Sequence, residues 1–272
     1  MGLCPEIAFL AISFVVLMRK THIFLRKMGV VHGHHIISVP GECLYDLDYC
    51  VMDTFDSIFQ RAAKRKGGKA ELEALLPKSS GKRKLTALTD DRYLAEMSRC
   101  VFRSGFVWKI IENKWPGFEQ AFDGFDVRTC ALLSDEAIEA LMRDDRIVKN
   151  AKKIQTVPKN AAFILSVRES HQSFGAYLAA WPSDDIIGLW ADLKKRGDRL
   201  GGQTGRYFLR FVGKDTPIFS GDVVKALIEQ KVVDKEPTSQ RALASVQAAF
   251  NELQAESWRE LCQISRVLAC SV

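Results

Sequence analysis

Proline is scarce in this sequence, with only 8 prolines in 272 residues. Long proline-rich linkers are therefore excluded. A globally disordered chain is excluded as well, because 47% of the residues are hydrophobic and 26% are charged. No repeat of fixed period is present. A chain of this length can bury a core as one large domain or as two small ones.

Cysteine pairs with CxxC spacing are missing, and the total of 7 cysteines is odd. This pattern argues against a disulfide scaffold and indicates reduced thiols in a cytoplasmic protein. The histidines and cysteines do not pair at helical spacing, which argues against a zinc site. The tract "HGHH" at residues 32–35 is a weak metal-binding candidate. We therefore expect no metal and no other cofactor.

Long apolar runs are also missing. The run "IAFLAISFVVLM" at residues 7–18 is short for a membrane span, and the residues before it lack the positive charge of a signal peptide. We expect no stable membrane partner. Helical spacing of apolar residues begins near Met52. We predict that residues 1–51 are an extension, dispensable or poorly ordered, with Met52 as an alternative start, and that residues 52–272 form the folded domain.

The remaining sequence reads as a series of helices. Thr89 and Ser134 each precede acidic residues and are predicted N-caps. Nothing alternates between apolar and polar residues as a strand does, so the predicted class is all-α. Trp258 is expected to belong to a closing helix packed on the core. Longer helical patterns cover residues 147–168, 184–196, 204–213, 221–230 and 238–268.

Positive charge is concentrated in one short stretch. The chain carries a net charge of +6, and seven cations between residues 194 and 214 oppose Asp198 alone, which is an excess of 7 − 1 = +6. Such focusing suits contact with a polyanion, although a solvated helix face explains many basic runs. The seven cations are Lys194, Lys195, Arg196, Arg199, Arg206, Arg210 and Lys214.

The same stretch, "LKKRGDRLGGQTGRYFLRFVG", has the pattern helix, turn, helix. Gly197 is predicted to end the first helix in a left-handed conformation. Gly201 and Gly202 allow close approach of a partner before Thr204 starts the second helix. Backbone amides at that N-terminus can bind a phosphate whatever the base sequence. The alternative is an ordinary helical corner.

Three segments in order resemble the DNA-3-methyladenine glycosylase I family of helix-hairpin-helix DNA glycosylases. They are "MSRCVFRSGFVWKIIENKWPGFEQAFDGFDV", "DDRIVKNAKKIQTVPKNA", and the hairpin with "TPIFSGDVV". The resemblance covers roughly residues 88–230. It implies an all-α fold with two helical lobes, a DNA groove between them and a hairpin at about residues 194–214. It also implies double-stranded DNA with alkylated bases as the partner, and a monomer.

The resemblance places a base pocket around one tryptophan. Trp108 matches the family's ring against which the alkylated base stacks, and Phe106 and Tyr93 are further pocket candidates. The family's pocket glutamate falls on Cys100, which a buried thiol on an apolar helix face also explains. The family's activity is base flipping followed by hydrolysis of the bond between the damaged base and deoxyribose.

Two carboxylates are candidates to replace the missing catalytic groups. Glu96 lies one turn before Cys100, but its place on the helix flank favours a surface ion pair with Arg99 or Arg103. The superfamily aspartate after the hairpin falls on Ser220, and Asp222 could compensate or simply support the next helix. The family's structural zinc ligands are not matched, because Asp222 and Ala226 stand at the positions of its C-terminal His and Cys.

The hairpin matches the family's phosphate-holding element through Gly201, Gly202 and Thr204, and Lys195 and Arg206 are predicted to contact DNA. We therefore predict a glycosylase that excises alkylated purines such as 3-methyladenine in base excision repair. The first alternative is a catalytically inactive lesion-binding protein of the same fold. The second is an unrelated helical interaction protein.

Overall fold

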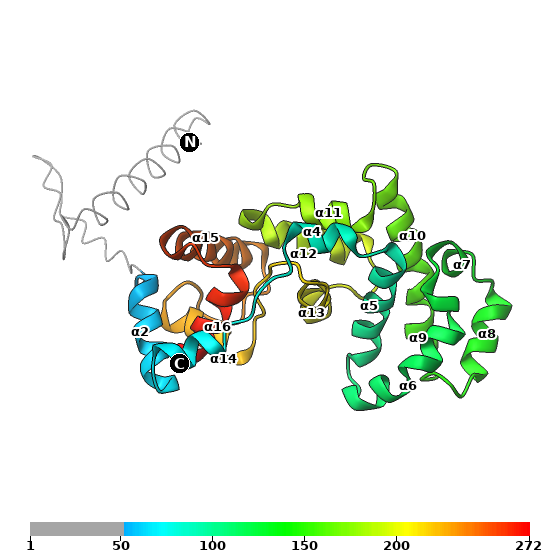
Figure 1. Ribbon diagram of the computed structural model, residues 1–272, viewed down its shortest axis with the longest axis horizontal. Helices are drawn as coiled ribbons and strands as arrows, with labels where there is room; N and C mark the ends of the chain where they lie inside the picture. The colour runs from blue at the N-terminus through cyan, green and yellow to red at the C-terminus, as the bar shows by residue number, and fades with distance from the viewer. Residues whose placement is uncertain (1–51) are drawn as a thin grey trace, which may run out of the picture. The chain divides into compact units, whose positions relative to one another are not determined.

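The computed structural model describes residues 52–272, which lie in the compact unit Cys50–Val272. The predicted extension at residues 1–51, with its "HGHH" tract, falls outside the described residues. Within residues 52–272 every regular element is a helix, so the all-α prediction is confirmed (Figure 1). None of the helices in this range is both long and apolar enough to cross a bilayer.

The helices follow one another with short connections. The first part of the described chain holds α2 (Phe55–Lys66), α3 (Lys69–Ala74), α4 (Gly81–Ala87), α5 (Asp90–Arg103), α6 (Trp108–Ala121), η1 (Asp123–Phe125), α7 (Val127–Ala131), α8 (Asp135–Arg143), α9 (Ala151–Ile154) and α10 (Thr156–Arg168). The second part holds α11 (Phe174–Ala180), η2 (Ser183–Asp185), α12 (Ile186–Arg196), α13 (Gly202–Val212), α14 (Gly221–Glu229), α15 (Gln240–Ser257) and α16 (Leu261–Ser271).

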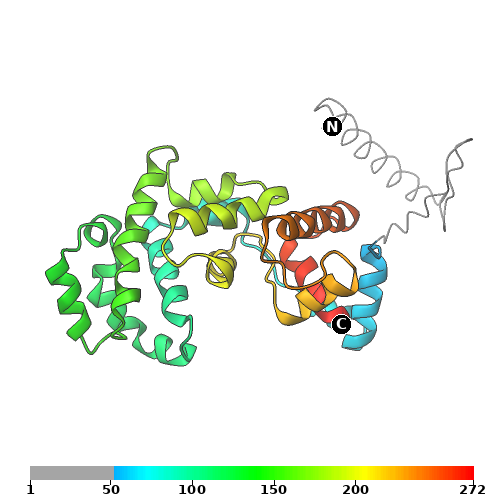
Figure 2. The same cartoon turned by 180° about the vertical axis from the view of Figure 1, so that it is seen from behind.

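Packing joins elements that are distant in sequence. α2 lies beside α16, and α14 packs on the same helix, as both views of the ribbon show (Figure 1 and Figure 2). α5 packs against α10 and α13, and α12 contacts both α13 and α15. The packing of α5 on α13 places the segment after α5, which carries the Gly-aromatic-x-Trp motif of Gly105, Phe106 and Trp108, beside the second helix of the hairpin.

Most of the clustered aromatic residues belong to the core, as expected from their helical spacing. Phe102, Phe118 and Phe125 are fully buried, and Phe122 is nearly so. Trp115 stacks on Phe118 and Phe125, with ring centroids 5.3 and 5.4 Å apart. This stack packs the second half of α6 against η1, and Phe118 also meets Phe102 of α5 edge-on at 4.6 Å.

Two helical patterns are interrupted. The pattern at residues 238–268 breaks at Trp258, which has a φ of 58° and ends α15. Trp258 is 87% exposed, so the prediction that it packs on the core was wrong, although α16 itself buries Leu261, Ile264 and Leu268. The left-handed cap turns the indole away from the core. The pattern at residues 147–168 likewise consists of two helices, α9 and α10.

Of the two predicted N-caps, only one forms a capping hydrogen bond. Ser134 caps α8 by accepting a hydrogen bond from the backbone N–H of Ala137. Thr89 occupies the N-cap position of α5 with extended backbone, but its side chain accepts no capping bond. The acidic first turn of α5, Asp90 and Asp91, complements the helix dipole there instead.

Candidate functional site

A tight turn joins α5 to α6 and carries the aromatic residues predicted to contact a base. α5 ends at Arg103, and α6 begins at Trp108. Gly105 has a φ of +74°, which side chains other than glycine rarely adopt. Phe106 is 37% exposed and Trp108 is 45% exposed, in contrast to the buried rings on either side. The turn therefore presents these two rings at the surface.

Trp108 is one of three rings that we call the aromatic shelf, defined as Trp108, Tyr207 and Phe211. The Trp108 ring meets Tyr207 and Phe211 edge-on, with centroid separations of 5.8 and 6.1 Å. Tyr207 and Phe211 stack on each other at 5.8 Å, and Phe211 is 45% exposed. Sequence reasoning missed Tyr207 and Phe211, although their i, i+4 spacing on α13 was the signal that they share a face.

Arg103 is held against the aromatic shelf. Its guanidinium carbon lies 5.1 Å from the ring centroid of Trp108 and 5.0 Å from that of Phe211. The guanidinium also forms an ion pair with Glu112 at 2.7 Å, and its Nη1 lies 3.5 Å from Glu96. Arg103 therefore supports the rings by cation–π attraction while two carboxylates neutralise its charge.

Glu96 belongs to the same cluster. It forms ion pairs with Arg99 and Arg103, as its place on the helix flank predicted, yet its side chain is only 18% exposed. The Cys100 thiol donates to Glu96 Oε1 at 3.6 Å. Burial raises the pKa of Glu96 and, more strongly, the pKa of the Cys100 thiol. Cys100 is thus a neutral hydrogen-bond donor rather than a thiolate.

Tyr93 lies away from the surface. It is fully buried, its hydroxyl donates to the carbonyl of Leu85 at 2.7 Å, and its ring contacts Phe174 and Phe208. Desolvation raises the pKa of this phenol. No exposed atom of Tyr93 is available to a base, so the structure gives it a packing role between α5, α11 and α13.

The glycine-rich hairpin forms between α12 and α13. Gly197 is extended rather than left-handed as predicted, with a φ of −91°, and Arg199 and Gly202 take positive φ values of 59° and 58°. α13 begins at Gly202 instead of Thr204. Gly202 is exposed, and a Cβ placed there would contact nothing within 4 Å. The backbone is thus open at a helix N-terminus, where amides favour an anion.

Close packing of the hairpin depends on a glycine that sequence reasoning missed. A Cβ on Gly205 would lie 2.1 Å from the carbonyl oxygen of Leu200, so only glycine fits. Thr204 is half-buried beside it, and Lys195 is exposed on the last turn of α12. The hairpin therefore combines one open face with one tightly packed face.

Arg206 does not lie on the open face. Its guanidinium carbon sits 4.3 Å from the ring centroid of Trp190 and 4.4 Å from that of Phe219. Burial lowers its pKa to about 10, and its Nε is buried without a hydrogen-bond partner. The guanidinium is engaged inside the protein, where it joins α13 to α12 and to the segment before α14.

Two further cations of the basic stretch are embedded. Lys214 is 7% exposed, and its ammonium donates to the carbonyl of Leu178 at 2.8 Å and to that of Trp181. Arg210 donates to the carbonyl of Thr216. These contacts satisfy backbone oxygens, so both side chains serve the fold.

The turn after the hairpin is organised by Ser220. Its hydroxyl accepts a hydrogen bond from the backbone N–H of Val223 and so caps α14. Asp222 is exposed in the first turn of α14 and forms no ion pair with the described residues. The structure does not bring Asp222 into contact with Glu96 or Trp108.

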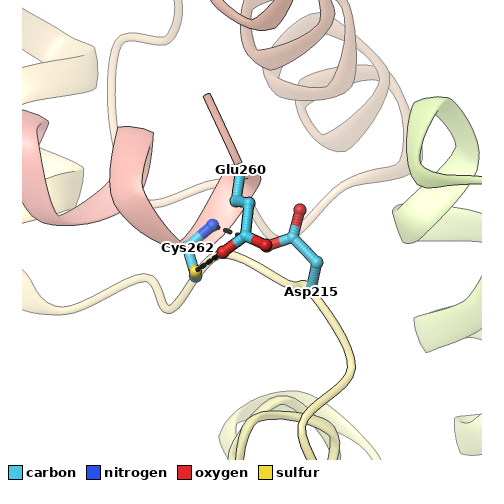
Figure 3. A group of neighbouring side chains, drawn as sticks. All are labelled: Asp215, Glu260 and Cys262. Atoms are coloured by element: carbon cyan, nitrogen blue, oxygen red, sulfur yellow. Dashed lines mark hydrogen bonds between the residues drawn. The ribbon is translucent and has the colours of Figure 1, made fainter. Parts of the chain in front are cut away.

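One group of possible metal ligands occurs among residues 52–272, namely Asp215, Glu260 and Cys262 (Figure 3). Asp215 accepts hydrogen bonds from the backbone N–H groups of Leu261 and Cys262 at 2.8 and 2.9 Å. Glu260 accepts from the backbone N–H and hydroxyl of Ser79. Asp215 thus holds the N-terminus of α16, whereas Glu260 ties the segment at Ser79 to that end of the helix.

The family model of methyladenine glycosylases matches residues 86–208. Among solved structures, the chain is similar to 3-methyladenine DNA glycosylase I (TAG) from Staphylococcus aureus, with 24% identity over 46% of this chain and 77% of that one and a TM-score of 0.42. A second 3-methyladenine DNA glycosylase I (TAG) is 27% identical over 46% of this chain and 80% of that one, with a TM-score of 0.39.

A third similar structure is the Methanocaldococcus jannaschii 8-oxoguanine glycosylase/lyase in complex with a 15mer DNA containing 8-oxoguanine. It is 14% identical over 78% of this chain and 95% of that one, with a TM-score of 0.41. The family match includes the Gly-aromatic-x-Trp turn and the hairpin as far as Phe208, and it supports a DNA glycosylase function. Over residues 86–208, the resemblance of the chain to the methyladenine glycosylases is confirmed.

Proposed function

We propose that the protein is a DNA glycosylase that excises alkylated purines such as 3-methyladenine from double-stranded DNA. The observation that carries the proposal is the exposed Trp108 ring on the aromatic shelf, in the segment that matches the methyladenine glycosylases. Stacking on an aromatic ring stabilises an unstacked base by roughly 1–3 kcal/mol, and a cationic base adds cation–π attraction. The open backbone at Gly202 and the exposed Lys195 are proposed to hold the phosphates.

The proposed reaction can proceed at a site that has no well-positioned general acid. Methylation at N3 gives adenine a positive charge before the reaction begins. When the glycosidic bond breaks, its electron pair stays on the base, which leaves as a neutral molecule. Water supplies the hydroxyl that joins deoxyribose, and its remaining proton passes to solvent. The protein must mainly hold the nucleotide out of the helix, at a cost of a few kcal/mol. Normal adenine would leave as an anion and would need an acid.

Glu96 is the proposed carboxylate of this site, and Asp222 is the weaker candidate. Glu96 shares the cluster of Arg103, which touches the Trp108 ring, and burial raises the pKa of Glu96. Asp222 is exposed on α14, where Ser220 rather than Asp222 makes the helix cap.

A second candidate function is a catalytically inactive lesion-binding protein. The observation that favours it is the use of Ser220 as a helix cap at the position where the superfamily places an aspartate. Such a protein would still bind a flipped alkylated base on the aromatic shelf, but it would not release the base.

The test is to incubate the full chain with methylated duplex DNA and to measure free 3-methyladenine by chromatography. Trp108→Ala is expected to lower kcat/KM about ten- to hundredfold, because it removes the stacking energy. Trp258→Ala is the matched control, since Trp258 is exposed at the end of α15, and it should leave release unchanged.

The outcomes separate the two functions. No release by a folded protein that binds methylated duplex more tightly than undamaged duplex would support the inactive lesion-binding protein. Equal binding to both duplexes without release would reject both functions.

A further inference from the structure

A buried lysine reaches the end of α5. Lys153, in the short helix α9, is 6% exposed. Its ammonium donates to the carbonyl oxygen of Phe102 at 3.0 Å and to that of Ser104. Carbonyls in the last turn of a helix lack intrahelical partners, and a cation there also complements the helix dipole. Lys153 thus closes the C-terminal end of the helix that leads into the aromatic turn.

The same ammonium also contacts a side chain of that turn. Lys153 Nζ lies 4.4 Å from the ring centroid of Phe106, which is 37% exposed. One cation therefore fixes the backbone on both sides of Arg103 and supports the ring that follows Gly105. Burial of the ammonium disfavours its charge and lowers its pKa, so these contacts must offset a real desolvation cost.

A second buried polar residue, on the neighbouring helix, holds the hairpin. Asn160 of α10 is fully buried. Its side-chain oxygen accepts from the backbone N–H of Asp198 at 2.7 Å, and its side-chain nitrogen donates to the Asp198 carbonyl at 3.2 Å. Helices α9 and α10 therefore hold the aromatic turn at one point and the hairpin tip at another.

We propose that Lys153 is a positioning residue for the base-binding turn, and that Asn160 has the corresponding role for the phosphate-binding hairpin. The inference rests on the proposed function. Because the two contacts are separate, loss of Lys153 impairs recognition of the damaged base and leaves sequence-independent duplex binding intact. Loss of Asn160 impairs duplex binding more than recognition of the damaged base. A lysine that only stabilised the fold would change both properties together.

The experiment compares Lys153→Met with Lys152→Met in the full chain. Lys152 is the exposed neighbour of Lys153, so the two variants make the same substitution one residue apart. Single-turnover release of 3-methyladenine from methylated duplex and Kd for undamaged duplex are measured for each. We expect Lys153→Met to slow release on the order of a hundredfold, the effect of a misplaced active-site group, with Kd within about twofold. Lys152→Met should not slow release.

Two further variants complete the comparison. Lys153→Arg keeps a charged donor and should recover most of the release rate. Asn160→Ala should weaken duplex binding by about tenfold, because it leaves the backbone groups of Asp198 without their partner. Proportional losses of release and duplex affinity in Lys153→Met, or an absence of rescue by Lys153→Arg, would overturn the proposal.

A separate measurement keeps the inference testable if the wild-type protein releases no base, an outcome that rejects the proposed activity alone. Hydrogen exchange of the free protein should then show faster exchange at the amides of residues 104–108 in Lys153→Met, with unchanged exchange at residues 198–205. Uniformly faster exchange along the chain, or exchange unchanged from wild type, would contradict the positioning role. Lys153→Gln replaces Lys153→Met if the latter does not fold.

Discussion

The basic stretch at residues 194–214 contains two kinds of cation. Four are exposed, namely Lys194, Lys195, Arg196 and Arg199. Three others are engaged by rings and backbone carbonyls inside the protein, namely Arg206, Arg210 and Lys214. A buried cation needs such partners, because loss of hydration is costly. The charge excess of this stretch therefore overstates the positive surface that a polyanion can meet, since three of its seven cationic side chains are held inside the protein.

The largest expected contrast between the two kinds is in stability. Arg206→Ala should lower the free energy of unfolding by about 2–4 kcal/mol, because it removes two desolvated cation–π contacts and leaves a cavity beside the Trp190 and Phe219 rings. Arg199→Ala, at an exposed position, should change the free energy of unfolding by less than about 0.5 kcal/mol. Urea unfolding measures both, and equal effects would remove the distinction.

A smaller contrast is expected in the pH dependence of stability. Desolvation lowers the pKa of Lys214 from 10.5 to about 8 in the folded protein. Between these values the unfolded chain binds more protons, so the free energy of unfolding rises with pH. We expect wild type to gain about 1–3 kcal/mol relative to Lys214→Met across this window.

Urea unfolding at a series of pH values tests this sign. Lys195→Met serves as the control, since Lys195 is exposed, and it should follow the wild-type curve. Parallel curves for wild type and Lys214→Met would show that the buried ammonium does not titrate differently from an exposed one.

The smallest expected effect falls on DNA affinity. Lys195→Ala should weaken binding to any duplex equally and reduce the slope of log K against log salt concentration by about 1, because one phosphate contact is lost. Its stability should change by less than about 0.5 kcal/mol. Lys64→Ala, at an exposed position of α2, is the control and should leave the slope unchanged. An unchanged slope in Lys195→Ala would place the DNA elsewhere.

The helical class was predictable because apolar residues recur at helical spacing along most of residues 52–272, and each such face is buried. The break at Trp258 was not predictable in this way. The apolar pattern continues across it, and only the backbone conformation of one residue separates α15 from α16. Helix ends without glycine or proline carry little signal in a single sequence.

The exposure of Trp108 and Gly202 was predictable, because a motif fixes their positions, and their roles toward a base and a phosphate stay predictions. The candidate site was not predictable where packing between helices decides. Tyr207 and Phe211 join the shelf only because α13 packs on α5, and the sequence alone gives no reason to separate them from core aromatics. Lys153 and Arg206 are of residue types that usually lie at the surface, and only the tertiary structure shows that their side chains are enclosed.

The contact between Asn160 and Asp198 has a consequence for how the hairpin can change over evolution. Asn160 pairs with the main-chain N–H and C=O of Asp198, as one peptide group pairs with another, so any residue with a backbone N–H can occupy the tip. The Asp198 carboxylate adds only an ion pair with Lys159, whose side chain is 65% exposed, and such pairs stabilise little. The side chain at position 198 can therefore vary while the backbone of the tip stays anchored.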